Sequence, residues 1–173
     1  MEIAKLFGLP AHPLLVHAAV VLLPLAAVLA VVVAVVPRAR PAYAWVAVVL
    51  AVVATGFVGL AQGSGEALEE SVRETPVVEE HAESGESVLP WAAVMTAAIG
   101  ALAVGDEWRR RSATARDGRP LGLPDAPGWV RPALSIVTLL VVLTAVGGTV
   151  QVIRVGHSGA RATWEDTVVV SDD

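Results

Sequence analysis

The sequence predicts an all-α polytopic membrane protein, a four-helix bundle in one domain, and three observations predict it. The 173 residues are 55% hydrophobic and only 17% charged, whereas soluble domains carry about 25% charged residues. The apolar residues gather in four dense runs separated by charged or Pro- and Gly-rich stretches. Cysteine is absent, which excludes disulfides, thiolate metal sites and c-type haem attachment. This pattern argues against a soluble globular enzyme and against a nucleic-acid binder with a basic surface.

The four runs predict helices over residues 13–36, 42–61, 76–104 and 132–153. Roughly 20 helical residues cross the roughly 30 Å hydrocarbon core. The third apolar run is short, but Thr75-Pro76 is typical of an N-cap followed by Pro at the first helical position, and Pro90 could kink the long helix that results. Gly63-Ser64-Gly65 is expected to end the second helix.

The basic residues predict the orientation of the bundle. The segments between helices one and two and between helices three and four hold eight Arg, and the other polar segments hold four Lys or Arg. The positive-inside rule therefore places both termini outside the cytoplasm. Eleven Arg against one Lys, with much Ala and Val, suggest a GC-rich bacterial genome, so we expect a multi-pass protein of the bacterial plasma membrane.

All four histidines fall on the predicted outer half of the bundle, and they come from three separate segments: His12, His17, His81 and His157. Neutral imidazole is a common ligand of haem iron and of other metals. His12 and His17 are about 140° apart around an ideal helix and about 7.5 Å apart along it, so each is better placed to pair with a histidine of another segment. Such a pair could hold a b-type haem, and four histidines permit two haems at most.

The candidate cofactor-binding residues follow from this interpretation. His17 and His81 rank first, His17 because polar residues within an apolar run are costly and often functional, and His12 and His157 follow. His157 lies in a Gly- and Ser-rich segment that also fits a surface loop. Arg154 and Arg161 could pair with haem propionates.

Two alternatives stay open. The same four histidines could bind copper or zinc at the outer face together with Glu79, Glu80 or Glu83. The chain could instead be a cofactor-free structural or accessory subunit of a membrane complex. No catalytic arrangement is readable from the spacing, so an electron carrier with a redox partner protein, or an accessory protein, is favoured over an enzyme. The sequence shows no evident internal repeat and leaves the oligomeric state open.

The motif His12-Pro13-Leu14-Leu15-Val16-His17 resembles the opening of a bacterial membrane-protein family called domain of unknown function 2231. The segments Gly63-Ser64-Gly65-Glu66, Glu79-Glu80-His81-Ala82-Glu83-Ser84-Gly85 and Gly156-His157-Ser158-Gly159-Ala160 fit the same family. The resemblance covers most of the chain and implies the four-helix layout. It implies no established activity, and haem-binding or redox-associated roles are suggested by analogy alone.

Overall fold

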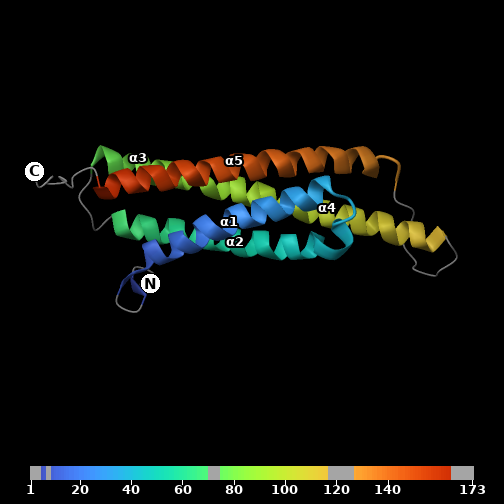
Figure 1. Cartoon of the computed structure of the whole chain (residues 1–173), viewed down its shortest axis with the longest axis horizontal. Helices are drawn as coiled ribbons and strands as arrows, with labels where there is room; N and C mark the ends of the chain where they lie inside the picture. Colours follow the sequence, from blue (N-terminus) through green and yellow to red (C-terminus); the bar gives the residue numbers. More distant parts are fainter. Residues whose placement is uncertain (1–4, 7–8, 70–74, 117–126, 165–173) are drawn as a thin grey trace, which may run out of the picture.

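The computed structural model of the chain describes residues 5–6, 9–69, 75–116 and 127–164. Two short antiparallel strands, β1 (Lys5–Leu6) and β2 (Leu9–Pro10), precede the helices. The helices are α1 (Ala11–Val35), α2 (Arg40–Glu69), α3 (Pro76–Glu86), α4 (Val88–Arg116) and α5 (Val130–Trp164), and they lie along one common axis (Figure 1).

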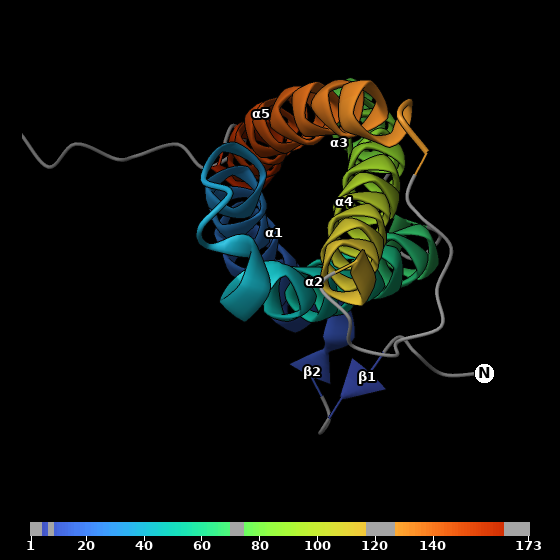
Figure 2. The same cartoon turned by 90° about the vertical axis from the view of Figure 1, so that its right-hand side faces the viewer.

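Four of the helices form a ring around this axis. α1 and α4 lie opposite each other, and each packs against both α2 and α5 (Figure 2). α3 precedes α4 along the chain and packs mainly against α5. One end of the ring, which we call the histidine end, joins the start of α1, the end of α2, α3 and the end of α5. The opposite end, where α1 and α4 finish and α2 and α5 begin, is called the arginine end (Figure 1).

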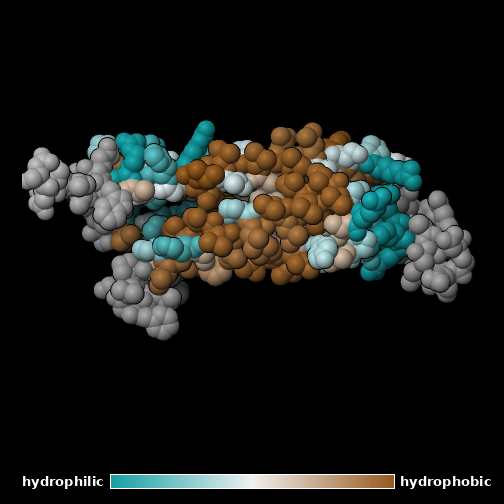
Figure 3. Space-filling model, viewed as in Figure 1, coloured by the Kyte–Doolittle hydropathy of each residue, from teal (hydrophilic) through white to brown (hydrophobic). Residues whose placement is uncertain are grey.

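The outer surface of the ring carries large apolar side chains that suit contact with lipid, and its interior carries small side chains that allow close helix packing. Large apolar side chains such as Leu25, Val46 and Leu139 are exposed, and they form an apolar belt between two polar ends (Figure 3). The buried positions of α2 are mostly alanine, which lets neighbouring helices approach closely. Four segments are long and apolar enough to cross a membrane, so the predicted all-α membrane bundle is confirmed. Its orientation in the membrane stays a prediction.

The break in the third predicted helix falls at Ser87, between α3 and α4. A proline cannot donate to the carbonyl four residues earlier and its ring clashes with that carbonyl. For Pro90 this carbonyl belongs to Glu86, which is where α3 ends. The predicted cap at Thr75 is confirmed, because its hydroxyl accepts a hydrogen bond from the Val78 amide at 3.3 Å.

The predicted ends of three helices were too early. α4 continues to Arg116, and α2 and α5 continue to Glu69 and Trp164. The prediction of a break at Gly63-Ser64-Gly65 is therefore wrong, and His157 lies within α5 and not in a surface loop. Helical propensity is a weak prior that tertiary packing overrides, and the glycines Gly65 and Gly159 each lie against an imidazole ring from another helix.

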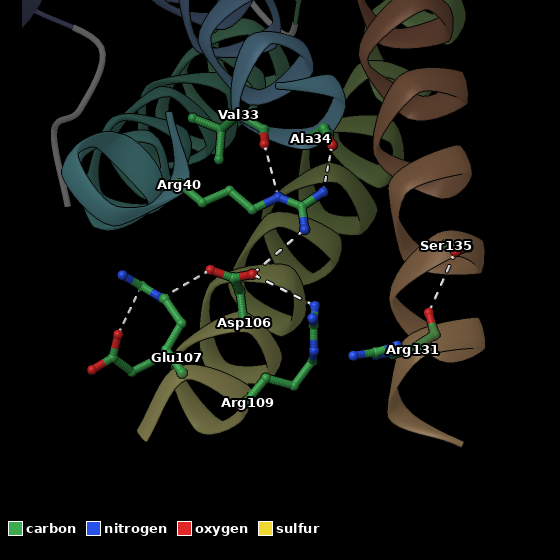
Figure 4. A network of polar contacts seen from close by, with 9 residues as sticks. Val33, Ala34, Arg40, Asp106, Glu107, Arg109, Arg131 and Ser135 are labelled. Carbon is green, nitrogen blue, oxygen red and sulfur yellow. Dashed lines mark hydrogen bonds and ion pairs between the residues drawn. The ribbon is translucent and has the colours of Figure 1, made fainter. Parts of the chain in front are cut away.

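A buried charge network holds the arginine end together, and Figure 4 shows it around Asp106. Arg40 at the start of α2 donates to the carbonyls of Val33 and Ala34 at 3.2 and 2.6 Å. These are among the last carbonyls of α1, which have no partner in their own helix and favour a cation. The same guanidinium lies 3.5 Å from Asp106 of α4, and Asp106 lies 3.0 Å from Arg110. One side chain thus ties α1, α2 and α4 together.

Arg40→Ala should destabilise the bundle strongly. It removes two hydrogen bonds to carbonyls of α1 and one ion pair, and it leaves the buried carboxylate of Asp106 with one cation fewer beside it. Breaking a buried pair in this way costs about 3 kcal/mol, which corresponds to a melting temperature about 6–12 °C lower in a chain of this size. Arg38→Ala is the matched control, since Arg38 is exposed. Thermal melting of both variants in detergent tests the network, and equal melting temperatures would contradict it.

Candidate ligand site at the histidine end

His12, near the start of α1, is held by the last part of α2. Its Nδ1 lies 2.9 Å from the carbonyl oxygen of Ala61 and 3.3 Å from the hydroxyl of Ser64. The imidazole lies against Gly65, where an added Cβ would come within 3.0 Å of the ring carbon Cε1. A glycine at this position is what allows the ring to approach the helix.

His81, on α3, is held by the last part of α5 in the same way. Its Nδ1 lies 3.1 Å from the hydroxyl of Ser158. Its imidazole lies against Gly159, where an added Cβ would come within 2.8 Å of Cε1. Both histidines are therefore fixed by a Ser-Gly pair on a neighbouring helix.

The hydrogen bonds of Ser64 show which nitrogen of His12 carries the proton. The Ser64 hydroxyl donates to the carbonyl of Ala61 at 2.9 Å, so its oxygen is left as an acceptor. Both atoms near Nδ1 of His12 are then acceptors, and Nδ1 must donate to them. In the neutral ring the lone pair consequently lies on Nε2.

The same reasoning holds for His81. The hydroxyl of Ser158 donates to the carbonyl of Val155 at 3.0 Å, so it accepts from Nδ1 of His81. Metal-binding histidines usually have one ring nitrogen fixed by a hydrogen bond while the other binds the metal. Both imidazoles thus have the hydrogen-bonding pattern of a ligand whose Nε2 is available.

Both imidazoles lie at the histidine end, His12 against the last part of α2 and His81 against the last part of α5. We refer to His12, His81, Ser64 and Ser158 as the histidine site.

The other candidate residues lie outside this pair. His17 is exposed on α1, and its Nδ1 is turned to the carbonyl of Pro13 in its own helix. His157 is exposed on α5 beside Ser158. Arg154 and Arg161 are also exposed, about one helical turn before and after Ser158.

The acidic candidates Glu79, Glu80 and Glu83 are exposed on α3. Within the described residues no three His, Asp or Glu side chains form a group that could hold a metal ion. The serines and glycines of the histidine site were not recognised as functional from the sequence. The signal that could have found them is the recurrence of Ser-Gly at residues 64–65 and 158–159, each near the end of a long apolar run.

The fold and this site define a polytopic membrane protein with a fixed pair of imidazoles at one end of a helical bundle. The family model described as a predicted membrane protein, DUF2231, matches residues 8–172. The chain belongs to this family. Comparison with curated proteins and with solved structures finds no match.

The contact between His81 and Gly159 can be tested with two neighbouring glycines of α5. Gly159→Ala should destabilise the protein by about 1–3 kcal/mol, because the new methyl group would overlap the imidazole. Gly156→Ala is the matched control: nothing lies within 4 Å of its added Cβ, and alanine in a helix interior gains about 1 kcal/mol over glycine. Thermal melting in detergent should therefore move in opposite directions for the two variants. A rise for both would contradict the close contact.

Proposed function

We propose that this membrane protein binds a b-type haem at the histidine end, with His12 and His81 as the two axial ligands, and that it serves electron transfer. The observation that carries the proposal is the pair of imidazoles from separate segments, each with Nδ1 donating to a serine hydroxyl, which leaves the lone pair on Nε2. Haem iron takes four nitrogens from the porphyrin and needs only axial ligands from the protein. Two fixed imidazoles are thus a sufficient donor set.

The surroundings of the two imidazoles also fit a haem. Gly65 and Gly159 bring the rings close to α2 and α5, and the two serines keep the rings from rotating. Arg154 and Arg161 supply cations near Ser158 that can pair with propionates.

In this proposal the haem supplies one-electron chemistry and the chain supplies the rest. His12 and His81 bind and orient the group, while Ser64 and Ser158 hold the proton on each Nδ1. Hydrogen bonding at the nitrogen that does not bind the metal raises the basicity of a ligating imidazole, so Ser64 and Ser158 would strengthen the two imidazoles as ligands. A bound haem would allow one-electron exchange with a redox partner protein at the outer face of the bacterial plasma membrane.

The competing functions use fewer of these features. A zinc site is almost always four-coordinate, so copper or zinc at the histidine site would need further ligands, for which Glu79, Glu80 and Glu83 are the nearest in sequence to His81. A cofactor-free accessory subunit would have no need for two imidazoles whose lone pairs both lie on Nε2. The pair of imidazoles therefore favours haem.

The absorption spectrum of the full chain, purified in detergent from cells well supplied with haem, tests the proposal. Dithionite reduction should give the bands of a low-spin, six-coordinate b-type haem. His12→Ala and His81→Ala should each lower the haem content more than about tenfold, because loss of even a second-shell partner costs 10–100-fold in metal affinity. His17→Ala and His157→Ala are the matched controls and should leave the spectrum unchanged.

Two results would contradict the proposal that the protein binds haem. A colourless protein with stoichiometric copper or zinc by elemental analysis would favour the metal site instead. A colourless, metal-free protein would favour the accessory subunit.

A further inference from the structure

The histidine site consists of the same arrangement twice. In α1 and α2 the elements are His12, Ser64 and Gly65, and in α3 and α5 they are His81, Ser158 and Gly159. In each set, Nδ1 lies within hydrogen-bond distance of a serine hydroxyl. Each hydroxyl donates to the carbonyl three residues earlier in its helix, and each ring lies against the glycine that follows the serine. Two unrelated helix pairs would not be expected to share every one of these contacts.

The correspondence continues into the membrane core. The offset of 69 residues that takes His12 to His81 also takes buried positions of α1 to buried positions of α4. Six of the eight buried residues of α1 have a buried equivalent at this offset: Ala19 and Val88, Leu23 and Ala92, Ala26 and Met95, Ala30 and Ile99, Val33 and Leu102, Ala34 and Ala103. The two segments therefore present equivalent faces to the interior of the ring.

The second helices of the two halves correspond in the same way. The offset of 94 residues that takes Ser64 to Ser158 also relates the buried residues of α2 to those of α5. Six pairs are buried on both sides: Arg40 and Leu134, Ala47 and Val141, Ala51 and Ala145, Ala54 and Gly148, Val58 and Val152, Ser64 and Ser158. The same offset relates two threonines, Thr55 of α2 and Thr149 of α5.

The arrangement in space agrees with these offsets. The hairpin of α1 and α2 and the hairpin of α3, α4 and α5 both leave the histidine end and return to it (Figure 1). Along the bundle axis, α1 lies opposite α4 and α2 lies opposite α5 (Figure 2). An approximate two-fold axis along the bundle relates the halves, as in membrane proteins made of parallel repeats.

The symmetry is not kept at both ends. The equivalent of Arg40 is Leu134, so the ion pair of Arg40 with Asp106 is not repeated at the equivalent position of α5. The histidine end keeps His, Ser and Gly in both halves. The side chains that are the same in both halves thus lie at the histidine end, where a single ligand could contact both halves.

We infer that the bundle is an internal duplication of one helical hairpin, and that its two half-sites meet at the pseudo-two-fold axis and share one ligand. Each half contributes one imidazole, one serine and one glycine. The identity of the ligand as haem rests on the proposed function, but the duplication does not. A shared site takes one haem per chain, whereas independent half-sites would take two.

The test exchanges the equivalent segments 61–65 and 155–159 within the full chain. Because Ser64, Gly65, Ser158 and Gly159 stay in place, the exchange needs six substitutions: Ala61→Val, Gln62→Gly, Gly63→His, Val155→Ala, Gly156→Gln and His157→Gly. If the segments are equivalent, this variant should melt within about 3 °C of the unmodified protein in detergent, a shift of about 1 kcal/mol. It should also keep the haem-to-chain ratio of the unmodified protein.

The matched control keeps the composition of α2 and moves its hydroxyl. Ser64→Gly with Gly65→Ser turns the hydroxyl by about 100° around the helix and puts a Cβ against the ring of His12. This variant should melt more than about 5 °C lower and lose most of its haem.

Two measurements could overturn the inference. An exchange variant that melts as low as the control, or lower, would show that the segments are not equivalent. Two haems per chain in the unmodified protein would contradict the shared site. If the unmodified protein binds no haem, the proposed function fails, and the comparison of melting temperatures still tests the duplication.

Discussion

Hydrocarbon offers no hydrogen-bond partner to a polypeptide, and the arrangement of this protein depends on that constraint. Four segments of the described residues are helical, long and apolar enough to cross it, and an α-helix satisfies its backbone within its own segment. The buried faces of α1 and α2 are rich in Ala, which lets neighbouring helices pack closely. One polar contact between helices is made by Thr55 and Thr96, whose hydroxyls lie 2.8 Å apart. The charged and imidazole side chains are thereby confined to the two ends of the ring.

The two ends satisfy their polar groups in different ways. At the arginine end, Arg40 donates to two carbonyls at the end of α1 and pairs with the carboxylate of Asp106. At the histidine end, Nδ1 of each imidazole donates to a neighbouring helix, which leaves the lone pair of His12 and His81 on Nε2. The arginine end thus joins helices to one another, whereas the histidine end has the form of a ligand site. The internal two-fold relation of the halves explains why that site has two imidazoles.

The fold was largely predictable from the sequence, because apolar runs of membrane-spanning length have few alternatives. The site was predictable only in part. His12 and His81 were among the candidates. His17 was ranked above His12 because it interrupts an apolar run. Whether a residue of such a run faces the interior depends on how α1 packs, and His17 is exposed. The serines were missed because Gly63-Ser64-Gly65 has the local preference of a turn. In the folded chain the neighbouring imidazole occupies the space that the glycine leaves, and the helix continues. Asp106 was missed because its partner Arg40 is far away in sequence.

The central claim is that serine hydroxyls hold the imidazoles of His12 and His81 with the proton on Nδ1 and the lone pair on Nε2. Nitrogen NMR of the ligand-free full chain, labelled with ¹⁵N-histidine in detergent at about pH 8.5, where histidine with a usual pKa of about 6.5 is neutral, measures this directly. Assignment uses His12→Ala and His81→Ala, which each remove one set of signals. The account predicts a protonated Nδ1 and an unprotonated Nε2 in both rings. An Nε2-protonated ring for either histidine in the unmodified protein would contradict it.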